Sequence, residues 1–186
     1  MELVLIGYFP KQATAKPDWL NAPVVREICS VSTCIAAAPD DWINHWTHND
    51  LWVYDTRDEG AAVVPSGAQS KFQIYGYRLL PVLFTDGKDH LFEIPVVNPE
   101  PLPATYESLG FDIVSRSVGN TFECSPLSCC DMAQEMAANK VCLLPTLPMA
   151  IAAAVKFSVE QPEPGPYLVL EVLRDVTRSV SSNGRA

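Results

Sequence analysis

Apolar residues in this chain come in short runs that proline, glycine and polar residues separate. The run at 3–9 predicts a buried strand, and the weak alternation at 24–33 favours a second extended segment. The longest β-like run is KFQIYGYRLLPVLF at 71–84. Asp86-Gly87 lies between it and the apolar run HLFEIPVV, and this dipeptide in such a position indicates a β-hairpin. The first half of the chain is therefore expected to be rich in antiparallel strands.

Two short helices are predicted within this half. A cap at Asp40 or Asp41 would start an amphipathic helix over PDDWINHWTH. Thr56 and Glu59 have the spacing of a capping box, which predicts a second helix that ends at Pro65. The segment LWVYD between the two helices reads as a short strand.

The second half alternates more regularly between predicted helices and strands. Helices are expected at ATYESLG (104–110), 126–138 and 147–159, and strands at FDIVSRS, TFEC, VCLL and YLVLEVLRDV, with a tight turn at Gly119-Asn120. The whole pattern predicts an α+β fold with a mixed, largely antiparallel sheet, β-hairpins and three to five short helices. The C-terminal third should show β-α-β-α-β alternation. No internal repeat is visible in the sequence.

Chain length and proline content bound the domain organisation. The 186 residues suit one domain, and the 16 prolines favour short elements with firm loops. Residues 1–175 are expected to form a single α+β domain, with the proline-rich segment 98–103 as the alternative boundary. The polar end, 176–186, is expected to fray.

Charge and hydropathy exclude several classes of partner. The net charge is −9, and the basic residues form no cluster, so nucleic-acid binding is disfavoured. No apolar stretch is long enough to span a membrane, and the N-terminus lacks a basic region and a cleavage site. We therefore expect a cytoplasmic protein whose six cysteines are reduced. An acidic surface would suit a basic protein partner. The sequence identifies no cofactor and sets no oligomeric state.

Two cysteine pairs share the same spacing, CSVSTC at 29–34 and CSPLSC at 124–129. In the second, a proline follows a serine, which predicts a helix start with Cys124 just outside the helix and Cys129 in contact with it. The first pair has no proline to mark a helix start, so Cys29 and Cys34 are interpreted as buried core residues. Spacers of four residues differ from those of most structural zinc sites, so no metal site is expected.

The second pair also suggests chemistry. A thiol beside a helix N-terminus has a lowered pKa, so Cys124 is a candidate nucleophile and Cys129 a candidate resolving thiol. Glu123 argues the other way, because a nearby carboxylate raises a thiol pKa. Packing remains the alternative role for Cys124.

The same corner gathers polar residues between apolar segments, and a small-molecule or anionic ligand is the hypothesis that follows. Turn and capping roles, or a cross-strand Arg–Glu pair, are the alternatives. The candidate ligand-binding residues are Ser115, Arg116, Asn120, Glu123, Ser125 and Ser128.

The histidines offer a weaker candidate. Asp41, His45 and His48 fall on one face of the predicted first helix, which would suit metal ligands or, more simply, a solvated polar face. The chain contains no phosphate-binding loop, no GxSxG elbow and no HExxH motif.

Three hypotheses for function remain, and whether the protein is an enzyme stays undecided. The first is a thiol-dependent enzyme or small-molecule-binding domain with its site at the corner formed by 115–129. The second is an acidic, non-enzymatic interaction protein of the inhibitor or immunity type. The third is a cysteine-based metal or redox sensor.

Overall fold

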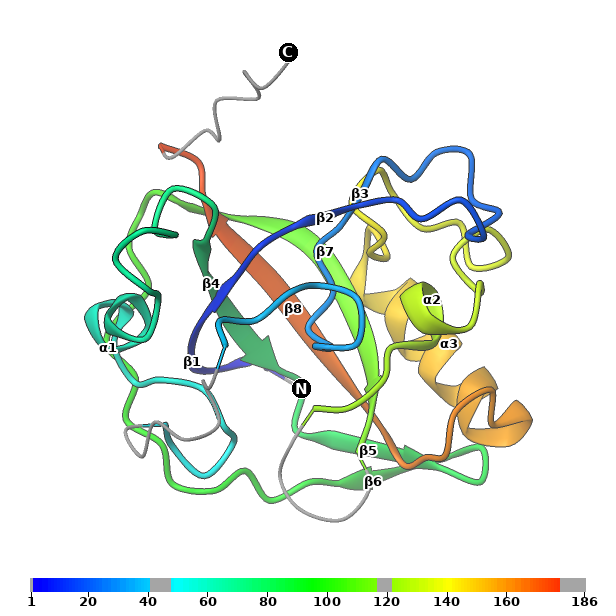
Figure 1. Cartoon of the computed structure of the whole chain (residues 1–186). Coiled ribbons are helices and arrows are strands. Elements are labelled where there is room, and N and C mark those ends of the chain that lie inside the picture. Colours follow the sequence, from blue (N-terminus) through cyan, green and yellow to red (C-terminus); the bar gives the residue numbers. More distant parts are fainter. Residues whose placement is uncertain (1, 41–47, 117–121, 178–186) are drawn as a thin grey trace.

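The computed structural model describes residues 2–40, 48–116 and 122–177 (Figure 1). The fold is α+β, built on an antiparallel sheet of six strands. The strands are β1 (Val4–Lys11), β2 (Thr14–Ala15), β3 (Glu27–Ile28), β4 (Gln73–Leu79), β5 (Val82–Thr85), β6 (Lys88–Leu91), β7 (Tyr106–Ser115) and β8 (Tyr167–Asp175). The helices are α1 (Arg57–Ala62), α2 (Pro126–Cys129) and α3 (Leu147–Glu160). None of these helices is long and apolar enough to cross a membrane.

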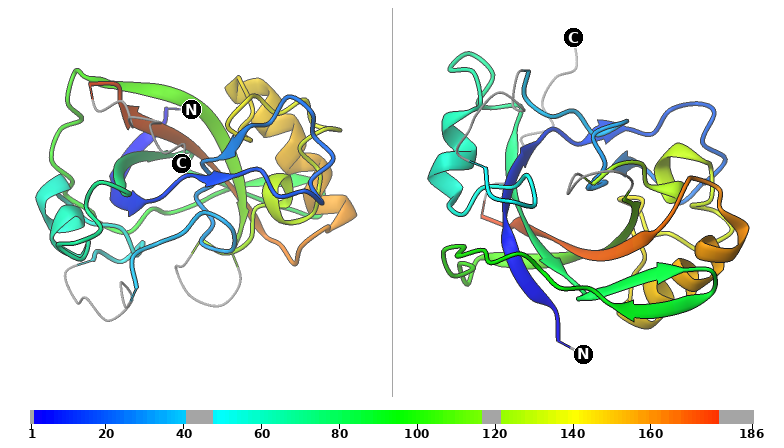
Figure 2. Two further views of the ribbon diagram at one scale, coloured as in Figure 1. Left: turned by 45° about the horizontal axis from the view of Figure 1, so that its top comes forward. Right: turned by 90° about the horizontal axis from the view of Figure 1, so that it is seen from below.

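The main sheet is organised around β8. Its path runs β1-β4-β8-β5-β6, and β7 pairs with the free edge of β8. The sheet is strongly twisted and curved (Figure 2). β2 and β3 form a separate two-stranded sheet. The hairpin predicted at Asp86-Gly87 is confirmed, since Thr85 pairs with Lys88 across that turn.

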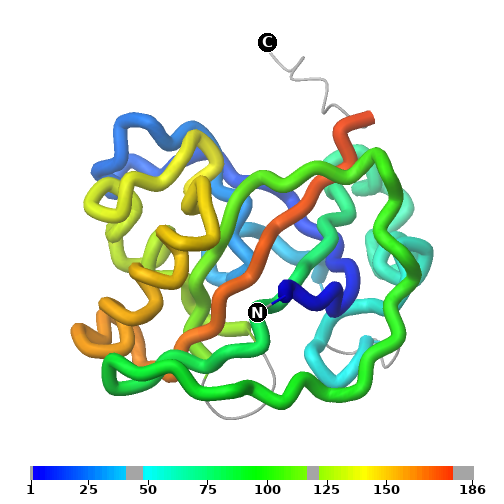
Figure 3. The backbone as a smooth tube through the Cα atoms, turned by 180° about the vertical axis from the view of Figure 1, so that it is seen from behind, coloured from blue at the N-terminus to red at the C-terminus, as the bar shows by residue number. Residues whose placement is uncertain are grey.

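Strand β8 is buried on both faces. Side chains alternate along a strand, so Leu170 and Val172 pack into one core while Tyr167 and Val169 pack into the other. Helix α3 covers the second core with residues at helical spacing, namely Ala150, Ala153, Ala154 and Phe157. Helices α1 and α3 lie on opposite sides of the molecule, with β7 and β8 between them (Figure 3).

Both helices with strong local signals form as predicted. Thr56 caps α1 and makes the capping box with Glu59. Thr146 caps α3 by accepting from the N–H of Met149, and α3 ends at Gln161 in a left-handed conformation. The helix predicted over PDDWINHWTH and the turn at Gly119-Asn120 lie outside the described residues. The total number of helices therefore stays a prediction.

Five predictions of local structure are wrong. The segment ATYESLG is not a helix, because from Tyr106 it belongs to β7 and pairs with β8 along the whole strand. The helix from Pro126 ends after one turn, and Asp131 and Ala137 have positive φ angles that no helix can contain. The segments LWVYD and VCLL are tight loops, because Trp52 and Cys142 have φ angles of 60° and 64°. The described part of TFEC is also not a strand, so the alternation expected in the C-terminal third is absent there.

The structure contains an internal repeat that the sequence did not show. Each half has a first strand with a bulge glycine, a tight loop, a threonine-capped helix and a second strand. Gly7 in β1 lies opposite Tyr77 in β4, and Gly110 in β7 lies opposite Val172 in β8. Tyr77 and Val172 in turn pair with each other. The two halves are therefore related by a two-fold axis that passes through the β4–β8 pair.

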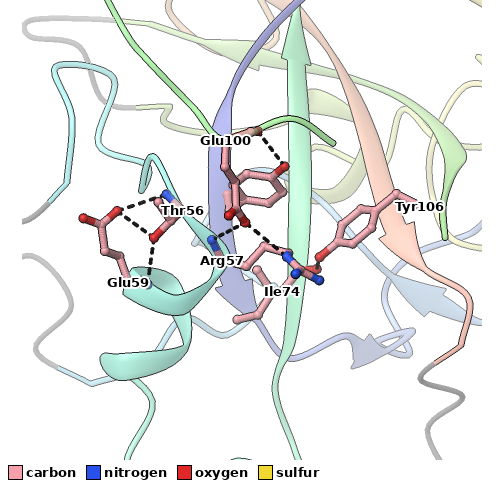
Figure 4. Close-up of polar contacts among 7 residues, drawn as sticks. Thr56, Arg57, Glu59, Ile74, Glu100 and Tyr106 are labelled. Carbon is pink, nitrogen blue, oxygen red and sulfur yellow. Dashed lines mark hydrogen bonds and ion pairs between the residues drawn. The ribbon is translucent and has the colours of Figure 1, made fainter. Parts of the chain in front are cut away.

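The connection between the halves is fastened to α1 by Glu100. Its carboxylate accepts hydrogen bonds from the backbone N–H and Nε of Arg57, and its backbone oxygen accepts from the hydroxyl of Tyr8 (Figure 4). Tyr106, at the start of β7, donates to the backbone oxygen of Ile74. These bonds join the second half to the first across the proline-rich segment.

Candidate functional site

A buried carboxylate joins the segments that carry the two cysteine motifs. Asp112 in β7 accepts hydrogen bonds from the hydroxyl of Ser30 and the N–H of Val31, both at 2.7 Å, and from the hydroxyl of Ser125 at 2.5 Å. Burial raises the pKa of Asp112, and these bonds oppose the rise because they favour the ionised carboxylate. Through Asp112, the loop at 30–32 and the start of α2 are held against one strand.

A buried lysine shapes the same loop. The Nζ atom of Lys11, at the end of β1, donates to the backbone oxygens of Ser30, Val31 and Ser32. Successive carbonyls of a strand point in opposite directions, so three that converge on one nitrogen require a curled backbone. Burial lowers the pKa of Lys11 to about 7, although Asp112 and nearby thiols act in the opposite direction.

The curled loop brings one cysteine of the first motif to both cysteines of the second. The sulfur atoms of Cys34, Cys124 and Cys129 all lie within 4.8 Å of one another. The separation between Cys34 Sγ and Cys124 Sγ is 3.2 Å. The predicted proximity of Cys124 and Cys129 is confirmed. The interpretation of Cys34 as a core residue is wrong, because it is exposed at the end of the curled loop.

The thiol pKa values also differ from the expectation. Burial raises the pKa of Cys124, and its neighbours Cys34 and Cys129 and the carboxylate of Glu163 raise it further. Burial and Cys34 likewise raise the pKa of Cys129. Helix α2 has only one turn, so it offers little dipole to oppose these effects. These effects act against the expected lowering of the Cys124 pKa, and the role of Cys124 as a nucleophile stays a prediction.

The other three cysteines lie outside this cluster. Cys29 is buried as expected, and its sulfur lies 3.8 Å from the hydroxyl of Tyr75. Cys142 is buried beneath α2 and donates to the backbone oxygen of Leu127. Cys130 follows Cys129 directly but points elsewhere, with its sulfur 3.0 Å from a carboxylate oxygen of Glu163.

A cavity of about 400 Å³ adjoins the cysteine cluster. Its lining is mainly aromatic and aliphatic, and it includes two cluster sulfurs and one carboxylate. Tyr77 is 1% exposed, and its hydroxyl has no hydrogen-bond partner among the described residues. Burial raises the pKa of Tyr77, so the phenol is a neutral donor at neutral pH. The lining residues are Phe9, Val31, Thr33, Cys34, Trp52, Val53, Tyr77, Phe122, Glu123 and Cys124.

The polar residues predicted for the ligand site do not all lie at the cavity. Glu123 lines the cavity, whereas Ser125, the N-cap of α2, and Ser128, within α2, are fully buried. Ser115 bonds to the segment before α2 through its backbone and through its hydroxyl, which accepts from the N–H of Cys124 at 3.2 Å. The guanidinium of Arg116 lies over the ring of Phe92, 4.7 Å from its centroid. Asn120 lies outside the described residues.

The histidine candidates receive little support. Asp41 and His45 lie outside the described residues. The ring of His48 stacks on Trp52, a residue of the cavity wall, at a centroid distance of 4.6 Å.

Lys11 and Asp112 were missed by the sequence analysis, although a signal for both was present. Lys11 ends the apolar run of β1, and Asp112 stands between apolar neighbours in the segment GFDIV. A charged residue within an apolar strand is buried only with partners, so such positions mark polar networks inside a core.

No protein-family model, curated protein or solved structure matches the chain.

Proposed function

We propose that this protein binds a small organic molecule that is largely apolar and carries no negative charge. The observation that carries the proposal is the cavity of about 400 Å³ beside the cysteine cluster. Ligand sites in proteins are concave, of this size, mostly apolar and equipped with a few polar groups that orient the ligand.

The lining residues support an uncharged or cationic ligand. Four aromatic side chains, those of Phe9, Trp52, Tyr77 and Phe122, contribute to the wall. Among the lining residues in the described part of the chain there is no lysine or arginine. Aromatic faces attract cations, and an anion would meet no basic side chain among these residues. These features favour a neutral or cationic ligand over the anion considered from the sequence.

Tyr77 contributes its side chain to the cavity wall. Its hydroxyl is inaccessible to solvent, so it offers no hydrogen bond to a molecule in the cavity. The wall at this point therefore favours an apolar part of the ligand.

The test uses three probes of similar shape and different charge: benzylammonium, benzyl alcohol and benzoate. Binding to the full chain is measured by saturation-transfer NMR titration. We expect benzylammonium and benzyl alcohol to bind and benzoate to bind least.

Two tryptophan variants serve as the matched pair. Thr33 is exposed at the cavity wall, so Thr33→Trp should fill the cavity and abolish probe binding without disturbing the core. Val96 is 99% exposed and lies outside the lining, so Val96→Trp should bind like the original chain. Equal binding of benzoate, or unchanged binding by Thr33→Trp, contradicts the proposal.

A further inference from the structure

We propose that Cys34, Cys124 and Cys129 together bind one thiophilic metal ion of the closed-shell d¹⁰ class, such as Zn(II) or Cu(I). Their three sulfur atoms lie within 4.8 Å of one another and come from two segments about ninety residues apart. This site goes beyond the ligand cavity and rests on a different observation, the mutual distances of the sulfurs.

The sulfur separations match the size of a metal–thiolate centre. Sulfur ligands about 2.3 Å from one tetrahedral zinc ion are about 3.8 Å from each other. The observed separations extend from 3.2 Å, between Cys34 and Cys124, to no more than 4.8 Å. Small rotations about the side-chain bonds would therefore place all three sulfurs around one ion.

The ligand set selects the class of metal. The group consists of three thiols, with no carboxylate or imidazole among its members. Thiolates favour zinc and copper(I) over hard ions such as magnesium and calcium. On binding, each thiol gives its proton to solvent and its sulfur forms one bond to the ion. Three protein ligands leave a tetrahedral ion one open position.

Residues around the cluster hold its sulfurs in place. Asp112 ties the loop before Cys34 to Ser125, at the start of the helix that carries Cys129. The hydroxyls of Ser128 and Ser32 lie 3.8 Å and 4.0 Å from Cys129 Sγ, as weak hydrogen-bonding neighbours. Metal sites depend on such outer contacts to orient their ligands.

The cluster is also open to an incoming ion. Cys34 is exposed, and Cys34 and Cys124 both line the cavity described above. A bound ion would therefore lie at the cavity wall. The rival explanation for the short Cys34–Cys124 distance is a disulfide, which would require an external oxidant such as a peroxide and would remove two of the three ligands.

The experiment titrates the reduced, full-length protein with Zn(II) and, separately, with Cu(I), each against a chromophoric chelator under anaerobic conditions. We expect one ion per chain. Cys34→Ser, Cys124→Ser and Cys129→Ser should each weaken binding by at least about tenfold, because each removes a ligand from the ion. Circular dichroism confirms that each variant is folded.

Cys130→Ser is the matched control, since Cys130 is adjacent in sequence to Cys129 but its sulfur contacts Glu163. It should change the affinity by less than about twofold, within the scatter of remote substitutions. Binding of benzyl alcohol to the original chain and to the three serine variants is measured in parallel, so failure of the cavity proposal is separable from failure of this one.

Three outcomes overturn the proposal. The first is no saturable uptake of either ion at one equivalent. The second is retention of uptake in the triple serine variant, or an equal loss in Cys130→Ser. The third is a protein that forms a Cys34–Cys124 disulfide in air, seen by mass spectrometry of its peptides, and binds no ion after reduction.

Discussion

Asn49 and Asn139 share two matching hydrogen bonds at equivalent places in the two halves of the molecule. The amide of Asn49 donates to the backbone oxygen of Ile6 at 2.9 Å, and that of Asn139 donates to the backbone oxygen of Leu109 at 2.8 Å. Each acceptor directly precedes the bulge glycine of its strand. Each side-chain oxygen also accepts from the N–H two residues further on, at 3.0 Å. One amide therefore holds each tight loop against its strand.

The equivalence predicts that the two asparagines have similar effects on stability. We expect Asn49→Ala and Asn139→Ala each to lower the free energy of unfolding by about 2–3 kcal/mol, because each leaves backbone groups without partners. Asn98→Ala, at an exposed position, should change it by less than about 0.5 kcal/mol. Urea unfolding followed by circular dichroism measures all three. A loss confined to one of the two loops would show that the halves are not equivalent.

The bulge glycines should be equally intolerant of a side chain. A Cβ atom at Gly7 would lie 2.5 Å from the backbone oxygen of Tyr54, and one at Gly110 would lie 2.6 Å from that of Leu144. Both glycines also have φ angles that disfavour other residues, 142° and 132°.

We expect Gly7→Ala and Gly110→Ala each to destabilise the protein by about 3 kcal/mol or more, since a backbone clash adds to the strain at positive φ. A Cβ atom at Gly67 would meet nothing within 4 Å, so Gly67→Ala is the control, with an expected change within about 0.5 kcal/mol. Differential scanning calorimetry provides the comparison. A melting temperature that is unchanged in either bulge variant contradicts the expectation.

Lys11 should make stability depend on pH. Its pKa is lowered from 10.5 to about 7 by burial in the folded protein, where Asp112, Cys34, Cys29 and Cys129 are its charged or titratable neighbours. Between pH 7 and 10.5 the unfolded chain binds a proton at Lys11 that the folded protein does not. Raising the pH across this window therefore favours the folded protein.

The measurement compares the original chain with Lys11→Met by urea unfolding between pH 6.5 and 9, below the range in which the buried thiols ionise. The difference in unfolding free energy, original minus variant, should increase with pH above about 7, with a limiting slope of about 1.4 kcal/mol per pH unit. Parallel pH profiles for the two proteins would show that Lys11 keeps its proton on folding.

The six thiols should react in an order set by burial. Cys34 is exposed and should be alkylated first by iodoacetamide at pH 8, followed by the half-buried cysteines. Cys29 and Cys142 are buried, and burial raises the pKa of Cys29 to about 11 and that of Cys142 still further. They should react only on global unfolding, at least about a thousandfold more slowly than Cys34. Peptide mass spectrometry resolves the order, and early labelling of Cys142 would contradict it.

Local signals in the sequence predicted local structure well. The capping box of Thr56 and Glu59, the turn at Asp86-Gly87 and the helix after Thr146 depend on neighbouring residues, and all three are confirmed. Tyr106 and the residues after it resemble a helix in sequence, but nine cross-strand pairs with β8 place them in a strand. Pairing with a distant strand cannot be read from a seven-residue window.

The cysteine cluster was only half predictable for the same reason. The proximity of Cys124 and Cys129 follows from one helix start, which a proline marks in the sequence. The position of Cys34 depends on Lys11 and Asp112, residues 23 and 78 positions away, which curl its loop and fasten it to β7. The two halves share an asparagine, a threonine and a bulge glycine at matching positions, which is too little identity to reveal the repeat.

The two-fold relation between the halves has a consequence for where function can lie. A half-length chain could form the same central sheet as an isologous dimer. Gln12 and Ser115 are equivalent in that symmetry. The N–H of Gln12 donates to the backbone oxygen of Ala37, and the N–H of Ser115 donates to the backbone oxygen of Cys124. The segment from Gln12 to Ala37 is long and contains Cys34, whereas the equivalent segment from Ser115 to Cys124 is short. Cys34 therefore lies on a segment without an equivalent of similar length in the second half, so the candidate site is placed where the two halves differ.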